Sequence, residues 1–435
     1  MLFHDFVSEI ESKNLIQKNT RVVVAVSGGI DSMCLLHLMV RLRALWHLEI
    51  LCAHVNHHLR DEADDDAKFV QKICMEWDVP FILHNAMIAK KAKEERISTE
   101  LAGRIVRYDF FKQIPCDAIV TAHNKNDVAE TVFMHLLRGC GLSGLCGIAA
   151  KRKDSIVRPL LSFSRENIQS YINMHNIPWR EDSTNSSILY TRNKIRHELI
   201  PKALTFNPSF LDAVYRMTFI LQQENEYMEQ EANKLSAYER IDGICRFSIA
   251  KLASAPPVLR ARVFRQAVQN YEDVQKMESL LSAQNGTTFA LSSGLQAVKE
   301  YDYITVFRPD LSVPKSVQLP KKGRIQFGQY EIKVGEGGMK LKQGLYYVRT
   351  RQNGDSFRPE GMQGKKKLKD FFIDEKIPKR LRDFIPIIVN NDKIAAVSQL
   401  RRSADFVPQP DEAYTEIMIN RLNFEKERDT YDAGN

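Results

Sequence analysis

Residues 20 to about 160 alternate between two hydrophobic patterns. Short apolar runs rich in β-branched residues predict strands, and stretches with an apolar residue every three or four positions predict helices. The predicted strands cover residues 21–26, 48–55, 80–85 and 117–123. The predicted helices cover residues 33–42, 61–77, 98–111 and 126–138. Strands and helices that alternate in this way form βαβ units, so we predict an α/β fold with a Rossmann-like parallel sheet.

The rest of the chain changes character twice. Residues 205–310 carry charged helical patterns and predict a long linker helix followed by a small helical domain. Residues 311–345 are rich in Pro, Gly and Lys, and we predict a linker region there. Residues 346–435 mix strand and helix patterns and predict a small α+β C-terminal domain. The predicted first domain is then residues 1–204.

The composition predicts a cytoplasmic protein without membrane contact. Of the 435 residues, 44% are hydrophobic and 27% are charged. No apolar run approaches the roughly 18 to 20 residues of a membrane span, and the N-terminus lacks the layout of a signal peptide. The seven cysteines are dispersed without a C-x-x-C pair. They indicate reduced thiols and argue against a zinc or iron–sulfur site.

Positive charge is concentrated near the C-terminus. The net charge is +8, and residues 349–402 alone hold 14 Lys/Arg against 7 Asp/Glu. Such a segment suits a polyanion, because phosphate contacts release condensed counterions. On charge alone, a solvated surface explains it equally well.

The stretch Ser27–Ser32, S-G-G-I-D-S, lies between the first predicted strand and the first predicted helix. Its two glycines allow backbone N–H groups to approach a phosphate, and the helix N-terminus adds positive potential. Its two serines can donate hydroxyl hydrogen bonds to the same anion. The spacing matches neither the Walker A pattern nor the dinucleotide pattern G-x-G-x-x-G. A tight turn without a ligand is the alternative.

In this strand–helix setting the stretch resembles the PP-loop of the ATP pyrophosphatases, a superfamily that cleaves ATP to AMP and pyrophosphate. The resemblance implies that ATP is a substrate whose pyrophosphate end is bound by Ser27, Gly28, Gly29, Ile30, Asp31 and Ser32. It also implies a role for Asp31, which would place Mg²⁺ beside the departing pyrophosphate.

Polar side chains near the ends of other predicted strands suggest ligand contacts, since parallel sheets bind ligands at the carboxyl ends of their strands. His54, with His57 and His58, suggests either a metal site or a hydrogen bond to the nucleotide. These histidines lack a fourth ligand and a typical ligand spacing. We therefore expect His54 to bind the nucleotide.

Two predicted helices add charged residues. Arg104 and Arg107 follow Glu100 at i+4 and i+7, so they predict either ion pairing with Glu100 or binding of substrate phosphates. Asp127 and Glu130 open the helix after a strand that ends at His123. Helix capping explains Asp127 alone, whereas two acids beside a histidine fit Mg²⁺ or an amine substrate better.

Further blocks follow in order, at Gly141–Ile148, Arg158–Leu161, Trp179–Asn185 and Tyr190–Pro201. This ordered series closely resembles the tRNA(Ile)-lysidine synthetases, and the resemblance resumes at 349–359 and 366–383. Enzymes of that family adenylate the wobble cytidine of a CAU anticodon with ATP and release pyrophosphate. Free L-lysine then displaces AMP, which switches codon reading from AUG to AUA. One departure is Gly103, where the family usually has alanine; glycine costs about 1 kcal/mol in a helix.

The resemblance implies a ligase with the following site residues. The implied catalytic residues are Asp31, Asp127, Glu130, Arg104 and Arg192. The implied Mg²⁺ ligands are Asp31 and Asp127, and His54 and His123 would join the loop in binding ATP. The implied tRNA-binding residues are Arg107, Arg196, Arg349, Arg351, Lys366, Lys367, Lys369, Arg380 and Arg382. The implied partners are tRNA(Ile) with a CAU anticodon and L-lysine, and a homodimer is left open.

Two other functions remain open at this point. Another PP-loop tRNA-modifying enzyme, such as a tRNA thiolase, would need reactive cysteines, and only Cys140 and Cys146 offer a pair. A non-catalytic RNA-binding protein would have no need of Asp31, Asp127 and Glu130 together. Both alternatives are disfavoured by the residues.

Overall fold

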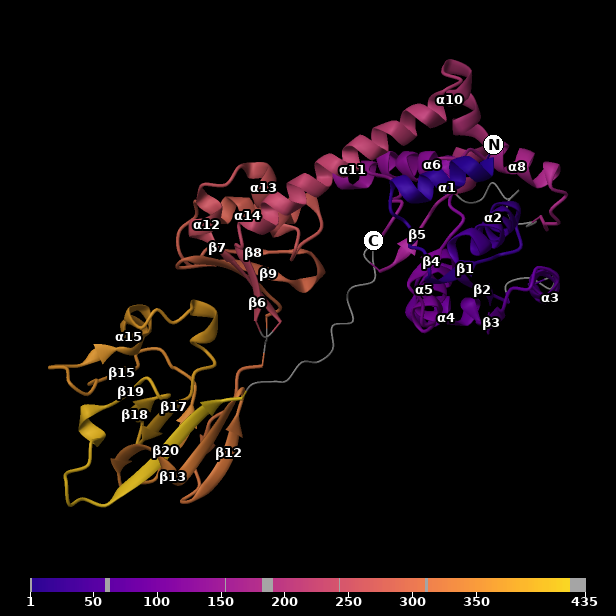
Figure 1. The fold of residues 1–435 in the computed structure, drawn as a ribbon. Coiled ribbons are helices and arrows are strands. Elements are labelled where there is room, and N and C mark those ends of the chain that lie inside the picture. The colour runs from indigo at the N-terminus through magenta and orange to yellow at the C-terminus, as the bar shows by residue number, and fades with distance from the viewer. Residues whose placement is uncertain are drawn as a thin grey trace. The chain divides into compact units, whose positions relative to one another are not determined.

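The computed structural model describes residues 2–58, 63–152, 154–181, 191–241, 243–309 and 312–422. The chain divides into two compact units, Met1–Tyr227 and Met228–Asn435. Figure 1 labels their elements. In the part of the chain that the structure describes, no helix has both the length and the apolar character to cross a bilayer.

A five-stranded parallel sheet organises the first unit, with strand order β3-β2-β1-β4-β5. Its strands are β1 (Arg21–Ala25), β2 (Glu49–Asn56), β3 (Phe81–Asn85), β4 (Ala118–Val120) and β5 (Ile156–Val157). The strand order reverses between β1 and β4, and ligands of open parallel sheets bind at such a switch point. The predicted Rossmann-like sheet is confirmed.

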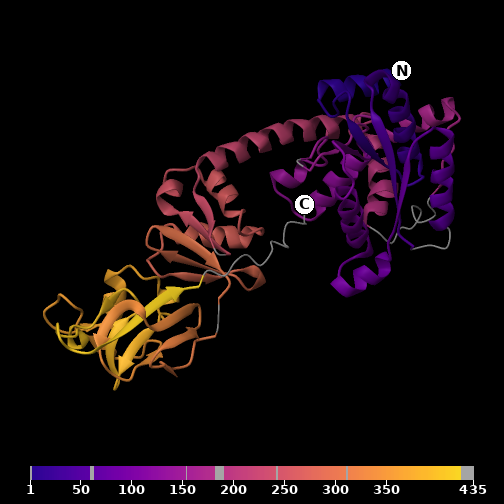
Figure 2. The ribbon, with the colours of Figure 1, turned by 60° about the horizontal axis from the view of Figure 1, so that its bottom comes forward.

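Helices cover both faces of this sheet (Figure 2). Val22 and Val24 of β1 pack with α1 (Leu2–Ser12), α2 (Ile30–Trp46), α3 (Ala63–Glu76) and α8 (Arg165–Met174). Val23 points to the other face and packs with Phe110 and Phe111 of α5 (Thr99–Lys112). Because successive strand residues point to opposite faces, the continuous apolar run of β1 buries both sides.

The other helices of the first unit follow the strands or precede the second unit. They are α4 (Ile88–Glu95), α6 (Lys125–Leu137), α7 (Leu142–Leu145), α9 (Thr191–Lys194), a π-helical turn (Ile195–Leu199), α10 (Ile200–Phe206) and α11 (Phe210–Lys234). Val128 and Val132 of α6 pack with Ile195, Ile200 and Val214 in a separate cluster. This cluster brings α9 and the π-helical turn against α6.

The second unit begins within α11 and contains an antiparallel sheet that the sequence did not predict. Its order is β6-β7-β10-β9-β8. The elements are β6 (Tyr238–Ile241), β7 (Ile244–Ser248), α12 (Ile249–Ala253), α13 (Pro257–Phe264), α14 (Tyr271–Leu280), β8 (Thr288–Ala290), a 3₁₀ turn (Ser292–Gly294), β9 (Gln296–Glu300) and β10 (Tyr303–Phe307). The helices expected in 205–310 are present, but the region is α+β.

The C-terminal part of the second unit is mainly antiparallel sheet. Its elements are β11 (Val317–Gln318), β12 (Gly323–Phe327), β13 (Tyr330–Lys342), β14 (Tyr347–Arg349), β15 (Ser356–Phe357), β16 (Lys366–Lys367), α15 (Leu368–Asp374), 3₁₀ turns (Lys379–Leu381 and Ala404–Phe406), β17 (Ile387–Asn390), β18 (Lys393–Val397), β19 (Arg401–Arg402) and β20 (Tyr414–Arg421). They form sheets ordered β11-β14-β17-β18-β19, β12-β13-β20 and β15-β16.

The prediction of a linker over residues 311–345 is wrong. Strands β12 and β13 pair with each other, and β13 also pairs along its length with β20, whose partners include Ile332 with Ile419. The glycines that suggested a linker include Gly338, at φ +96°, where a Cβ would lie 2.6 Å from the carbonyl oxygen of Ile417. Glycine there permits a bulge between paired strands.

Candidate active site at the carboxyl edge of the parallel sheet

The loop Ser27–Ser32 joins β1 to α2 and is held by its own serines. Oγ of Ser32 accepts hydrogen bonds from the N–H groups of Ser27 and Gly28, both at 3.2 Å, and donates to the carbonyl of Gly29 at 2.9 Å. Gly28 has φ +91°, and a Cβ there would lie 3.3 Å from the side chain of Val70. This backbone requires glycine. The loop therefore presents the unpaired first N–H groups of α2 to an anion.

Asp31 lies in the first turn of α2 and faces α6 across the switch point. Its Oδ1 accepts a hydrogen bond from Nδ2 of Asn124 at 3.0 Å. Burial, and then the neighbouring carboxylate of Asp127, raise the pKa of Asp31 to about 6, and Asn124, Arg165 and Arg196 only partly offset them. Two carboxylates that repel each other in a partly buried position form a site that favours a cation.

Asn124 was not singled out by the sequence, although it organises this edge. It caps α6: its Oδ1 accepts from the N–H of Asp127 at 3.2 Å, and Oδ2 of Asp127 accepts from its N–H at 2.9 Å. This reciprocal pair is a capping box, with Asn124 at the N-cap and Asp127 at N3. The spacing N-x-x-D was the available signal. Asp127 therefore takes part in the cap of α6 and also lies close enough to Asp31 to raise its pKa.

Glu130 lies one turn further along α6 and has no exposed surface. Its carboxylate accepts hydrogen bonds from Nε of Arg192 at 2.8 Å and from Nε of Arg196 at 2.6 Å. Asp127 accepts from Nη2 of the same arginines, at 3.2 and 3.5 Å. The two predicted acids and the two predicted arginines therefore form one ion-pair network.

The π-helical turn explains how both arginines reach Glu130. Arg192 belongs to α9, and Arg196 follows it by four residues in the π-helical turn, whose Ile195 is buried against α6. Such wider turns often occur at functional sites. The preceding residues 182–190, which include most of the Trp179–Asn185 block and Tyr190, lie outside the described residues.

His123, at the end of β4, is surrounded by arginines. Burial, and then Arg158, Arg192, Arg107 and Arg104, keep its pKa well below the ordinary value, so its imidazole is neutral at pH 7. Nδ1 of His123 lies 3.1 Å from the hydroxyl of Thr121. A neutral ring among cations can hydrogen-bond a nucleotide without adding charge. Arg104 and Arg107 come from α5, where the side chain of Glu100 is outside the described part.

His54 is less accessible than expected. Its side chain is buried, and its Nδ1 lies 2.8 Å from the carbonyl oxygen of Val26, immediately before the loop. It therefore supports the loop backbone, and only its Nε2 remains for a nucleotide. Among the residues that the structure describes, no three His, Cys, Asp or Glu side chains gather as metal ligands. Gly103 would tolerate alanine, because a Cβ would lie 3.6 Å from the His57 ring.

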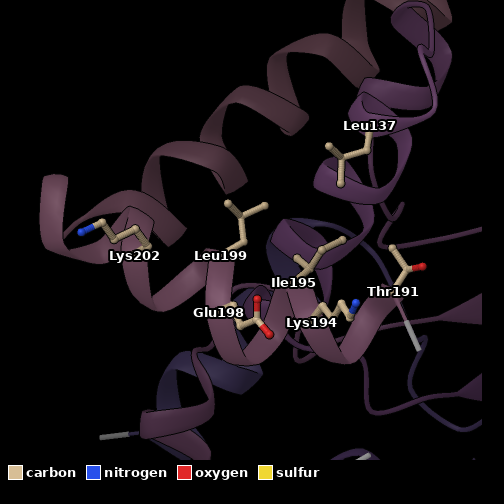
Figure 3. A pocket seen from close by; sticks show the side chains of 7 residues that line it. All are labelled: Leu137, Thr191, Lys194, Ile195, Glu198, Leu199 and Lys202. Carbon is tan, nitrogen blue, oxygen red and sulfur yellow. The ribbon is translucent and has the colours of Figure 1, made fainter. Parts of the chain in front are cut away.

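A pocket of about 350 Å³ lies beside α9, the π-helical turn and α10 (Figure 3). It is lined by Leu137, Thr191, Lys194, Ile195, Glu198, Leu199 and Lys202. None of the predicted site residues lines it. No residue of the loop Ser27–Ser32 lines this pocket, so it does not include the phosphate-binding groups of that loop.

Two family models match the chain. A PP-loop domain matches residues 4–203, and the TilS substrate C-terminal domain matches residues 347–418. A tRNA(Ile)-lysidine synthase of Clostridium tetani is 34% identical over 92% of this chain and 94% of its own length. The chain belongs to the tRNA(Ile)-lysidine synthase family.

Two further members of the family match this chain over a similar length. The tRNA(Ile)-lysidine synthase of Clostridium acetobutylicum is 33% identical over 97% of this chain and 100% of its own length. That of Thermotoga maritima is 31% identical over 91% of this chain and 94% of its own length. The PP-loop match covers every site residue predicted in the first unit. These two relatives match 97% and 91% of this chain, so the family resemblance extends over both units.

The predicted tRNA-binding residues of the C-terminal domain fall into two groups. Leu368, Phe371 and Phe372 are buried in α15, as its pattern predicted. Lys367 and Lys369 are exposed beside them. Lys366 pairs with Asp374, and Arg351 donates to Asp383 at 2.7 Å while remaining partly exposed. These four cations are at least partly exposed to solvent.

Three predicted tRNA-binding arginines are instead buried or held by protein groups. Arg349 is 7% exposed and donates two hydrogen bonds of 2.8 Å to Asp355. Arg382 is buried and donates to the carbonyl of Ile377. Arg380 pairs with the buried Glu300 at 3.0 Å. Their charges are bound by protein groups, so fewer of the predicted tRNA-binding cations are exposed than the sequence suggested.

Proposed function

We propose that the protein converts the wobble cytidine of the CAU anticodon of tRNA(Ile) to lysidine, using ATP and free L-lysine. The observation that supports this most directly is the meeting of the phosphate loop with the network of Asp127, Glu130, Arg192 and Arg196 at one sheet edge. The enzyme is an ATP-dependent ligase. The relatives that match over most of the chain carry the same activity in their name.

In the first step, the C2 oxygen of cytidine attacks the α-phosphorus of ATP and pyrophosphate leaves. The loop Ser27–Ser32 and the N-terminus of α2 hold the pyrophosphate end. Charge develops on the departing pyrophosphate, so donors fixed before the reaction stabilise the transition state. We assign neutral His123 and Nε2 of His54 to hydrogen bonds with the nucleotide, because the ring of His123 is uncharged and Nδ1 of His54 is already engaged by Val26.

Asp31 and Asp127 fit Mg²⁺, which prefers carboxylate oxygens. Their mutual repulsion, which contributes to the raised pKa of Asp31, would be relieved by a cation between them. When bound, Mg²⁺ would neutralise charge on the leaving pyrophosphate. Asn124 orients both acids, because it donates to Oδ1 of Asp31 and caps the helix that carries Asp127.

In the second step, an amine of lysine attacks C2 and AMP leaves. The attacking amine must be neutral, and Asp127 can hold the other ammonium group of lysine. Glu130 is fully engaged by two arginines, so we assign it to positioning Arg192 and Arg196. These arginines then face the transferred phosphate or the RNA backbone.

One assay tests this function against the alternatives. The protein is incubated with tRNA(Ile) bearing CAU, ATP and labelled lysine, and the RNA is examined for lysine and the solution for AMP and pyrophosphate. Label in the RNA with one AMP and one pyrophosphate per lysidine supports the ligase. Sulfur transfer instead of lysine would indicate a thiolase, a reading already weakened because Cys146 directs its thiol to the carbonyls of Leu142 and Leu221. RNA binding without ATP cleavage would indicate a non-catalytic binder.

A further inference from the structure

Tyr108 of α5 lies between two guanidinium groups. The Cζ atoms of Arg104 and Arg152 are each 5.3 Å from the centroid of its ring. Arg104 lies one turn before Tyr108 on α5, and Arg152 comes from the segment that leads into β5. Cation–π contacts of this kind hold guanidinium groups in place without neutralising their charge.

A third guanidinium, that of Arg158, also interacts with Tyr108. Arg158 follows β5 and is 3% exposed. Its Nη1 donates to the carbonyl of Ala149 at 2.6 Å, it hydrogen-bonds Tyr108, and its Nε has no partner in the described part of the chain. Buried charges are normally paired, and a buried donor without a partner requires an explanation.

The charges around the three arginines do not balance. Arg152 is paired with Asp154 by two bonds of 3.0 Å. No carboxylate within the described residues pairs with Arg104 or Arg158, while Asp127 and Glu130 are engaged by Arg192 and Arg196. Neutral His123 adds no negative charge. Among the described residues, Arg104 and Arg158 therefore have no carboxylate partner, whereas Arg152 has Asp154.

We propose that the exposed Arg104 and the partly buried Arg152 bind a phosphodiester group of the RNA substrate next to the wobble cytidine, and that the buried Arg158 positions Tyr108 beside them. The planar guanidinium fork matches the oxygens of a phosphate. ATP is the other source of phosphate, but its pyrophosphate end is assigned to the loop after β1. Its members come from α5 and from the segments flanking β5, the strand that pairs with β4. The inference rests on the proposed function, because it takes tRNA as the substrate.

The test combines protein variants with RNAs that lack one charge. Each tRNA(Ile) carries a neutral methylphosphonate either 5′ or 3′ of the wobble cytidine. The full-length protein is compared with Arg158→Gln, Arg152→Gln and Tyr108→Phe. Lys18→Gln is the matched control, since Lys18 precedes the central strand β1 at its amino end and its Nζ lies 5.4 Å from the centroid of the Trp46 ring. The measurements are the Kd for RNA by filter binding, the KM for RNA and the KM for ATP.

We expect one methylphosphonate position to weaken RNA binding by about 10- to 100-fold, the loss of one charged hydrogen-bonding group. Arg158→Gln should weaken binding of unmodified RNA to a similar extent. With the RNA that carries that methylphosphonate, its Kd should rise little further. The KM for ATP should stay unchanged, and Lys18→Gln should behave as the wild type. If Arg158→Gln does not fold, as judged by circular dichroism, the half-buried Arg152 provides the same comparison.

Other outcomes would overturn the assignment. If the loss of RNA affinity in a variant adds to the loss caused by the methylphosphonate at both linkages, the arginines do not bind these phosphates. If only the KM for ATP rises, the cluster binds the nucleotide instead. Tight binding of both modified RNAs to the wild type also excludes the site. If the wild type binds RNA but forms no lysidine, the proposed function fails while the Kd comparison still decides the phosphate site.

Discussion

Glu130 and Arg196 form a bidentate ion pair, with Nε 2.6 Å from Oε1 and Nη2 3.0 Å from Oε2. Glu130 is fully buried, and Arg192 completes its hydrogen bonds at 2.8 Å. The pair ties the π-helical turn to α6 beside the phosphate loop. Its loss should therefore affect both stability and chemistry.

Replacement of Glu130 by alanine should lower the free energy of unfolding by about 3 to 5 kcal/mol, because it leaves partly buried arginines without a partner. Lysidine formation should be lost along with it. Urea unfolding of the first unit measures the effect, with Glu224→Ala on the exposed surface of α11 as the control. An unchanged unfolding midpoint in Glu130→Ala would contradict the positioning role.

Asp31 predicts a dependence of stability on pH. Its pKa in the folded protein is raised to about 6 from 3.8, so the folded state holds the proton more tightly than the unfolded state. The stability contribution is present below about pH 4 and is lost as the pH rises to about 6. Above pH 6.5, Asp31→Asn should stabilise the metal-free protein by roughly 2 to 3 kcal/mol. Thermal melts from pH 4 to 8 measure this, and a constant difference between the two proteins across that range would disprove it.

The same substitution should remove activity. Asp31→Asn or Asp31→Ala should abolish pyrophosphate release that depends on tRNA, since the proposed Mg²⁺ ligand is gone. If Asp31→Asn is more stable than the wild type at pH 7 but inactive, the carboxylate of Asp31 serves the reaction rather than folding. Full pyrophosphate release by Asp31→Ala would remove this residue from the mechanism.

Exposed lysines of the C-terminal domain should set the salt dependence of tRNA binding. Replacement of Lys365, Lys367 and Lys369 by glutamine should reduce the slope of log Kd against log salt by roughly 2 to 3, at about 0.7 to 0.9 per phosphate contact. Lys315, Lys321 and Lys322 are also exposed and form a control set of equal charge. Equal slopes for the two triple variants would mean that binding depends on net charge rather than on this surface.

Arg349 should contribute to stability instead of RNA binding. Its side chain is buried against Asp355, so Arg349→Gln leaves a carboxylate that is 11% exposed without its partner. We expect a loss of about 3 to 5 kcal/mol from the second unit and an unchanged salt slope. Denaturant titration with filter binding separates the two effects. If Arg349→Gln is as stable as the wild type but has a smaller slope of log Kd against log salt, Arg349 binds RNA after all.

The boundary of the C-terminal domain can be tested by truncation. A chain that ends at Gly344 keeps β12 and β13 but lacks β20, so an unpaired strand edge is exposed and the protein should aggregate. A chain that ends at Pro309 lacks all three strands and should stay soluble, with its Kd for ATP unchanged. Size-exclusion chromatography distinguishes them. If the chain ending at Gly344 is monomeric, residues 311–344 behave as the linker that the sequence predicted.

Local patterns were sufficient for the parallel sheet and its phosphate loop. The apolar run of β1, the glycines of Ser27–Ser32 and the Ser98 cap of α5 act over a few residues, so the sequence reveals them directly. Strand β13 escaped prediction because its pairing with β20 is non-local. β13 and β20 are separated by more than 70 residues, and only their pairing converts a stretch rich in glycine into a strand.

The same division applies to the site. By itself, the sequence predicted which residues carry the chemistry and that several of them lie at strand ends. Only the tertiary structure decided their partners: that Glu130 binds both Arg192 and Arg196, that Asn124 links Asp31 to Asp127, and that Arg349 is buried against Asp355 while Arg158 is buried without a carboxylate partner among the described residues. The physical reason is that charge and residue type are fixed by sequence, whereas burial and pairing depend on which distant segments pack together.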